Sequence, residues 1–162
     1  MRHTISVLVE NEFGVLSRVA GLFSGRGFNI ESLCVAETTD PTTSRMTIVT
    51  RGNEQIIEQI EKQLNKLINV IKVVDNKADE SVERELVLIK VSAEDNTRSD
   101  VLRVADIFKG KIVDVSPATY TIEATGNQRK IEALIELLRP LGLKEIVRTG
   151  KVAIGRGARI LK

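Results

Sequence analysis

The pattern of apolar and polar residues along the chain has two periods, one typical of a strand and one typical of a helix. Segments with these two periods follow one another in a fixed order. In the first segment apolar side chains alternate with polar ones, as in a half-buried strand. After Gly14 they recur at the spacing of a helix, and a second helical pattern follows Asn53, a residue suited to cap it. The predicted strands lie at residues 3–10, 28–37, 45–51 and 70–75. The order of the first half is therefore β-α-β-β-α-β.

The second half of the chain repeats this order. Thr97 and Asp100 suggest a capping box before its first helix, and Pro140 with Gly142 ends its second helix. The predicted strands lie at residues 84–92, 111–116, 118–125 and 143–149. The predicted fold class is α+β, with two tandem ferredoxin-like βαββαβ units, each an antiparallel sheet with helices on one face.

The predicted domain boundaries follow from the composition of the segment between the two halves. Residues 77–83 are polar and lack apolar periodicity, which predicts a linker between domains at residues 1–76 and 84–162. The second domain ends in GKVAIGRGARILK, which carries four basic residues and no acidic one. This segment lacks the glycine spacing of a phosphate-binding loop, and we interpret it as a basic flexible or partner-contacting tail.

Each predicted unit is small, so folding alone buries a modest share of its surface. The face of the sheet without helices also carries an apolar side chain, Cys34 or Val35 depending on the register, and an unpaired edge strand is a liability. Pairing of two copies solves both problems. We therefore predict a homodimer.

Composition narrows the function. Aromatic residues make up 3% of the 162 residues and the net charge is +2, which argues against a nucleic-acid partner. A single cysteine excludes an internal disulfide and a multi-cysteine metal site. No apolar run is long enough for a membrane span, and we expect the chain in the cytoplasm.

No catalytic constellation is present in the sequence. The single histidine, His3, lies on the first predicted strand, and Cys34 lies among apolar neighbours, so we expect both to be structural. The sequence also lacks the residues needed for three other functions of this fold. RNA-recognition modules need strand aromatics, metal carriers need Cys-x-x-Cys, and acylphosphatase-like enzymes need an arginine in the first loop, where this chain has Asn-Glu-Phe-Gly.

The loop before the first helix offers a different chemistry. A helix N-terminus exposes backbone N–H groups and about half a positive charge, so it suits a carboxylate. Gly14 allows close approach of a ligand, and the amides of Asn11 and Asn29 can bind an ammonium or a carboxylate. A free amino acid fits this loop. The alternative is that Gly14 only makes the turn and Asn29 only precedes a strand.

The sequence also resembles a known family. The strand-Glu-Asn-x-x-Gly-x-Leu-x-Arg loop, the stretch from Arg26 to Leu33 and the string Ser-Arg-Met-Thr at residues 44–47 are similar to the ACT domain of acetolactate synthase regulatory subunits. The resemblance continues through the second half and the glycine-rich tail. It implies that residues 1–76 form an ACT regulatory domain.

The resemblance implies a non-catalytic chain that binds and activates a separate catalytic subunit, which carries thiamine diphosphate, Mg²⁺ and FAD. It also implies feedback inhibition by valine in branched-chain amino-acid synthesis. Valine would bind between two ACT domains of a homodimer. The implied contacts are Asn11, Gly14, Val15 and Leu16 of one chain, with Ser17 in support, and Asn29 and Ile30 of the other.

Two alternatives remain open at this point. The chain could be a free-standing amino-acid sensor of the ACT type without an enzyme partner, or an enzyme in its own right. In the second half, the counterpart of the glycine loop is SAEDNTRSD, which lacks the Asn-x-x-Gly pattern. We therefore predict no second valine site there.

Overall fold

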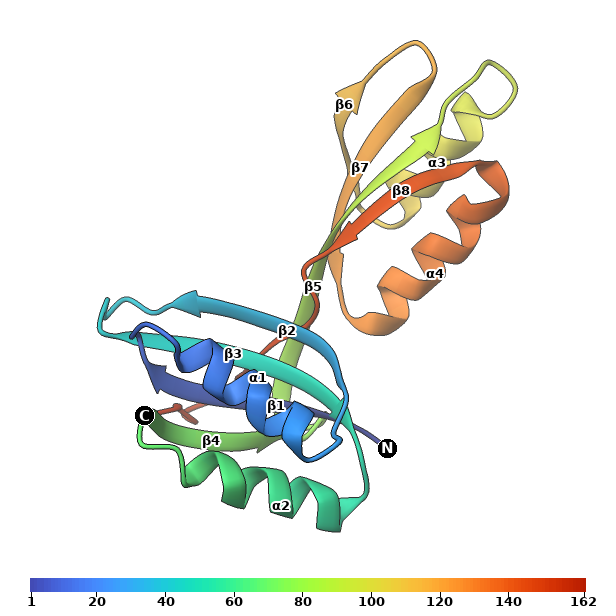
Figure 1. Cartoon of the computed structure of the whole chain (residues 1–162). Helices are drawn as coiled ribbons and strands as arrows, with labels where there is room; N and C mark the ends of the chain where they lie inside the picture. Colours follow the sequence, from blue (N-terminus) through green and yellow to red (C-terminus); the bar gives the residue numbers. More distant parts are fainter. The chain divides into compact units, whose positions relative to one another are not determined.

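The computed structural model describes residues 1–162, and the chain divides into two compact units. The first contains a four-stranded sheet in the order β2-β3-β1-β4, with α1 and α2 on one face (Figure 1). Its elements are β1 (Arg2–Glu10), α1 (Val15–Gly25), β2 (Ile30–Glu37), β3 (Thr43–Arg51), α2 (Glu54–Asn65) and β4 (Val70–Asn76).

The second unit repeats this arrangement with the strand order β6-β7-β5-β8. Its elements are β5 (Ser81–Ser92), α3 (Arg98–Ile107), β6 (Lys111–Val115), β7 (Thr119–Gly126), α4 (Gln128–Leu138), the 3₁₀ turn η1 (Arg139–Leu141) and β8 (Leu143–Arg148). All strand pairs with a defined register are antiparallel. The predicted fold class, two ferredoxin-like units with helices on one face, is confirmed.

Strand alternation and helix periodicity build one core in each unit. In β1 the alternate residues Ile5, Val7 and Val9 face α1 and α2 and are almost completely buried. In the second unit Val87, Ile89 and Val91 of β5 have the same position against α3 and α4. The two cores form separate clusters, so each unit has its own hydrophobic interior.

The predicted linker and tail differ from the structure. Within the predicted linker, Ser81–Glu83 already belong to β5, because β5 is longer than its apolar pattern. Residues 151–162 group with the first unit and not with the second, and they contain a strand that we did not predict, β9 (Val152–Gly155). This strand pairs with β5, and the backbone N–H of Arg156 donates to the carbonyl of Glu80 at 2.9 Å.

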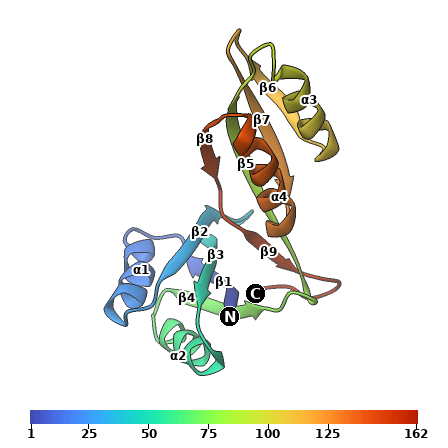
Figure 2. The same ribbon diagram turned by 90° about the vertical axis from the view of Figure 1, so that its right-hand side faces the viewer.

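The C-terminal segment lies on the face of the first sheet that the helices leave open. Figure 2 shows the chain ending beside β1 and β4, and β9 contacts both strands. Thr4 and Ser6 of β1 point to this face, yet both are less than 5% exposed. The segment is therefore part of the first unit's packing, and the prediction of a flexible tail is wrong for β9.

The helix starts are capped in different ways. The side chain of Asn53 accepts from the N–H of Ile56 at 2.9 Å, as predicted, and Asn127 caps α4 in the same way. Thr97 makes no side-chain cap to α3, so the predicted capping box with Asp100 is absent. Gly14, at the start of α1, has no side chain to offer.

Candidate functional site

The start of α1 combines unused backbone donors with a glycine in a special conformation. Gly14 is the N-cap residue and has φ of 83°, in the left-handed region that favours glycine. No acidic residue lies in the first turn of the helix. The N–H of Val15 donates to the carbonyl of Glu12 at 3.4 Å, so the donors left for a ligand are the N–H groups of Leu16 and Ser17.

A hollow of about 310 Å³ opens beside this helix start. Its floor is apolar, because Val9, Val15 and Met46 each expose 3% or less of their surface. Leu16 of the helix and Val35 of β2 form part of its rim and are 42% and 39% exposed. The hollow thus offers a small branched side chain an apolar surface.

Asn11 connects the loop to the turn after β2. Its side-chain Nδ2 donates to the carbonyl of Pro41 at 3.0 Å and to Oε2 of Glu37 at 3.3 Å, and its backbone N–H donates to the carbonyl of Thr42 at 2.8 Å. These bonds use the hydrogens of the amide group and leave its oxygen as an acceptor. Asn11 and the Glu37 carboxylate therefore present negative charge density at the rim of the hollow.

A second polar group supports the loop from the side of β4. Asn69 is 6% exposed, and its Nδ2 donates to carboxylate oxygens of Glu10 at 3.1 Å and Glu12 at 3.3 Å. Arg18 of α1 donates to the Asn69 side-chain oxygen. This network fixes the strand, the loop and the helix relative to one another, so the N-terminus of α1 is held in place before any ligand binds.

Together these groups suit a zwitterion with an apolar side chain. The N-terminus of α1 can receive the carboxylate of an amino acid, and the oxygens of Asn11 and Glu37 can receive its ammonium group. The apolar floor can receive the side chain. Of the predicted site residues, the structure brings together Asn11, Gly14, Val15 and Leu16. Ser17 follows them on α1 and is exposed.

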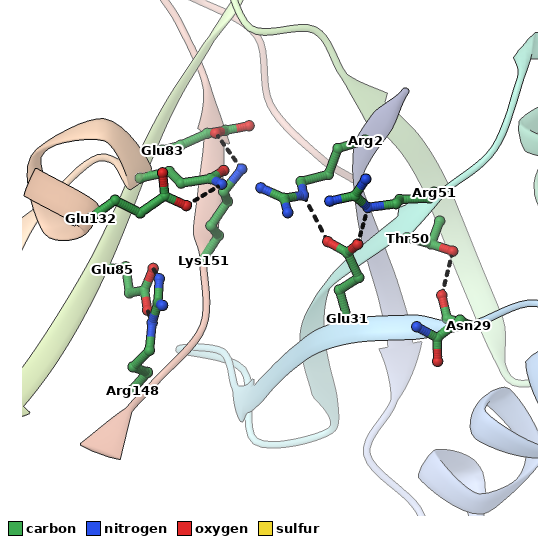
Figure 3. Close-up of polar contacts among 11 residues, drawn as sticks. Arg2, Asn29, Glu31, Thr50, Arg51, Glu83, Glu85, Glu132, Arg148 and Lys151 are labelled. Carbon is green, nitrogen blue, oxygen red and sulfur yellow. Dashed lines mark hydrogen bonds and ion pairs between the residues drawn. The ribbon is translucent and has the colours of Figure 1, made fainter. Parts of the chain in front are cut away.

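Asn29 and Ile30 lie at the opposite end of β2. The hollow contacts residues 35–37 at the end of this strand, whereas Asn29 precedes its start, which is roughly 20 Å away at the rise of a strand. Thr50 donates to the Asn29 backbone carbonyl at 2.6 Å, and Asn29 itself is exposed (Figure 3). One chain therefore does not bring all six predicted contacts together.

β2 is one of the two edge strands of the first sheet and pairs with β3 alone. Beside Asn29, Glu31 binds both Arg2 and Arg51 (Figure 3). Burial raises the pKa of Glu31, but the hydrogen bond from Arg51 and the charge of Arg2 outweigh it, so the pKa lies below its usual value. The middle of β2, Ser-Leu-Cys-Val-Ala, has neither a charge nor a proline to protect the edge.

Sequence reasoning missed the contribution of β2 and β3 to the hollow. Val35, Glu37 and Met46 line it, and their place depends on the register in which Val35 pairs with Met46 and Glu37 with Ser44. Periodicity shows which residues share a face of a strand but not which residues of two strands are neighbours. In the structure no group of three or more His, Cys, Asp or Glu is placed to hold a metal ion, and every helix is too short or too polar to span a bilayer.

Comparison with known proteins gives a consistent result over the whole chain. Residues 5–72 match a family model described as the small-subunit-like ACT domain of AHAS (acetohydroxyacid synthase), and residues 84–157 match one described as the small subunit of acetolactate synthase. The acetolactate synthase small subunit of Mycobacterium leprae is 57% identical over 97% of this chain and 93% of its own length. That of Haemophilus influenzae is 55% identical over 97% of both chains.

A solved structure supports the same relation at the level of the fold. The crystal structure of the acetolactate synthase small subunit from Thermotoga maritima is 44% identical to this chain and superimposes with a TM-score of 0.91. The match covers 98% of this chain and 99% of the other. Sequence and fold are therefore shared from end to end, including the C-terminal segment.

Proposed function

Because the chain belongs to the family of acetolactate synthase small subunits, we propose that it binds and activates the catalytic subunit of that enzyme and makes it sensitive to valine. The observation that carries the proposal is the helix start at Gly14, where free N–H groups adjoin an apolar hollow. The catalytic chemistry then belongs to the partner subunit, where we expect thiamine diphosphate, Mg²⁺ and FAD.

Valine fits the hollow by charge and by shape. Its carboxylate would accept from the N–H groups at the start of α1, and its ammonium group would face Asn11 and Glu37. Its isopropyl group would lie on Val9, Val15 and Met46, which form the buried floor.

The site would be completed by a second copy of the chain. Two β2 strands can pair antiparallel about a twofold axis between Leu33 and Cys34. This register would place Ile30 of one chain opposite the partner subunit's Glu37. Asn29 would then lie beside the partner's hollow and supply a further amide. The uncharged middle of β2 supports this pairing, because such an edge is open to another strand.

Regulation requires that valine favours one arrangement of the dimer over another. A ligand shifts such an equilibrium only by its differential affinity, and a coupling of about 1–3 kcal/mol is sufficient for strong regulation. A site shared by two chains meets this condition, because its ligand contacts depend on how the two chains are placed. The catalytic subunit would then bind one of the two arrangements better.

Calorimetric titration of valine tests the site directly. The parent chain should bind valine, and Gly14→Asp should bind it at least about a hundredfold more weakly, because a carboxylate would face the ligand's own carboxylate. Gly14→Asn is the matched control. Asn and Asp tolerate the left-handed conformation to a similar degree, and a side chain at residue 14 meets no neighbouring atom.

The control therefore separates charge from backbone strain. Gly14→Asn should keep more valine affinity than Gly14→Asp, and both should still activate the catalytic subunit in an activity assay. Equal loss in the two variants would make Gly14 a structural residue. If the chain binds valine but neither captures nor activates the catalytic subunit, it would instead be a free-standing sensor.

Mixing two defective variants tests the shared site. A dimer of Gly14→Asp with Asn29→Ala would contain one site with both defects and one site with none. Valine binding should therefore reappear when the two variants are unfolded, mixed and refolded together. A site within one chain would give no recovery, which would contradict the proposed pairing.

A further inference from the structure

A second cavity lies on the opposite face of the first sheet from the helices. It has a volume of about 390 Å³, within the range of small-molecule sites. Its walls are β1, β3 and β4 on one side and the C-terminal segment, residues 154–161, on the other. None of its lining residues belongs to the hollow at Gly14.

The cavity contains a half-buried guanidinium group that no carboxylate neutralises. Arg45 donates from Nη2 to the carbonyl of Ala153 at 2.9 Å and to Oγ of Ser6 at 3.4 Å. Both acceptors are uncharged, and the hydrogens on Nε and Nη1 remain without a partner. Burial lowers the pKa of Arg45, and no opposing charge compensates for it.

Neither acidic residue of the cavity wall neutralises Arg45. Asp75 pairs with Ile5, so its carboxylate lies on the helix face of the sheet, 3.1 Å from Nδ1 of His3, and Glu80 binds Arg159. The charge left over in the cavity is therefore that of Arg45, with exposed Lys77 also in the wall. A half-buried cation without a carboxylate partner is a favourable place for an anion.

The rest of the wall is apolar. Val74 of β4, Ile154 of β9, and Ile160 and Leu161 beyond it line the cavity. A phosphate group would leave these side chains unused and would need more donors than one guanidinium group supplies. A carboxylate with an aliphatic body uses both the charge and the apolar wall.

We propose that this cavity is a second ligand site, which binds a small aliphatic carboxylate through Arg45 and holds its apolar body between β4 and the C-terminal segment. The assignment gives a role to two sequence features that the valine site leaves unexplained. These are the arginine of the Ser-Arg-Met-Thr string at residues 44–47 and the C-terminal segment. The ligand also connects that segment to the sheet that carries the Gly14 loop.

The test uses a probe that the valine site disfavours. 4-Methylpentanoate has a carboxylate and a branched aliphatic body but lacks the ammonium group of an amino acid. We would titrate it into the full chain labelled at isoleucine methyl groups and follow Ile154 and Ile160 by NMR. Both methyl signals should shift and saturate, while 4-methylpentanamide, which has the same shape without charge, should bind at least about tenfold more weakly.

Substitutions at the cavity then test which residues bind the carboxylate. Arg45→Gln removes the charge and keeps a donor for the Ala153 carbonyl, and it should weaken binding of the carboxylate at least about tenfold. Arg51→Gln is the matched control, because Arg51 lies on the same strand, exposed, in a pair with Glu31. Ile154→Glu leaves Arg45 in place and supplies a competing carboxylate, so it should also weaken binding if Arg45→Gln fails to fold.

The outcomes separate this site from the valine site. Gly14→Asp should bind 4-methylpentanoate as the parent does, whatever becomes of valine binding. The proposal is overturned if the two methyl groups do not respond, if the amide binds as well as the acid, or if the folded Arg45→Gln or Ile154→Glu variants bind like the parent.

Discussion

The two units share one order of elements, but the loops before their first helices are built differently. In the first unit the short side chain of Asn11 reaches the carbonyl of Pro41, and the hollow lies beside it. In the second unit the long side chain of Arg98 makes the corresponding connection, donating to the carbonyls of Ala93 and Pro117, each at 3.1 Å. Both units thus tie this loop to the turn between their second and third strands.

The comparison separates the features that the topology determines from those that the loop sequence determines. The βαββαβ order places a helix N-terminus near the end of the first strand in both units. In the second unit the N-cap residue is Thr97 and the charged Arg98 follows it, whereas in the first unit the N-cap residue is Gly14, which has no side chain. The fold therefore supplies a position for an anionic ligand, and the loop sequence decides whether a ligand can use it.

The open faces of the two sheets differ as well. On the first sheet the C-terminal segment contacts β1 and β4, and Thr4 and Ser6 are less than 5% exposed. On the second sheet Leu88 and Val147 are paired neighbours on the open face and remain 39% and 57% exposed. The segment follows the second unit in sequence but completes the first, so the two units are not interchangeable copies.

The largest effect is expected in the cores and tests whether the units are independent. Ile5 and Ile89 are equivalent residues, each 0% exposed at the centre of its sheet. Ile89→Ala should lower the free energy of unfolding of the second unit by about 2–5 kcal/mol. Because the cores are separate clusters, amide hydrogen exchange should speed up in the second unit alone.

The reciprocal variant, Ile5→Ala, should act on the first unit by a similar amount. It should leave the protected amides of β7 and α4 as they are in the parent chain. Uniform acceleration of exchange in both units by either variant would mean that the chain unfolds as one cooperative body.

A smaller effect should distinguish the role of the Asn11 loop from that of the Arg98 loop. Asn11→Ala should weaken valine binding about tenfold, because it removes one amide contact, and should change stability little. Arg98→Ala should lower the free energy of unfolding of the second unit by about 1–2 kcal/mol, because two carbonyls lose a charged donor, and should leave valine affinity unchanged. Calorimetry and chemical denaturation measure the two quantities, and a loss of valine affinity in Arg98→Ala would contradict the comparison.

The sequence predicts most of the fold because local pattern and tertiary structure agree in the cores. Alternation in residues 3–10 and the cap at Asn53 identify the elements that the structure contains. The start of β5 was missed because Ser81 and Glu83 are polar and Val82 alone makes no alternating pattern. The short strand Val152–Gly155 was missed because its few apolar residues lie in a segment rich in glycine and basic residues.

The candidate site is only half visible in the sequence. Gly14 and Asn11 can be identified in the sequence because glycine permits close approach of a ligand at a helix start and asparagine supplies an amide just before it. The contribution of Glu37 depends on strand register, and the position of Asn29 depends on a second chain. The cavity at Arg45 needs three strands and the C-terminal segment together, and no local pattern encodes such a meeting.

The smallest effect concerns two carboxylates on α2 and gives the first unit a pH dependence of its own. Burial, and then the charge of Asp75, raises the pKa of Glu61. In contrast, the hydrogen bond from Lys62, 2.9 Å away, lowers the pKa of Glu58. One turn of helix therefore carries two groups whose ionisation affects stability in opposite directions.

Because the folded-state pKa of Glu61 lies above the unfolded value, its negative charge costs stability at neutral pH, and the cost disappears as the pH falls through the folded-state pKa. Glu61→Gln should thus be more stable than the parent at neutral pH, by less than about 1 kcal/mol after solvent screening, and equally stable below the unfolded pKa. Glu58→Gln should be less stable than Glu61→Gln at neutral pH. The lowered pKa of Glu58 contributes stability at pH values above its unfolded-state pKa, and this stability is lost as the pH falls. The substitution removes that contribution. Hydrogen exchange of first-unit amides at several pH values measures both differences, and a gain in Glu61→Gln that persists below the unfolded pKa would show that packing, not charge, is the cause.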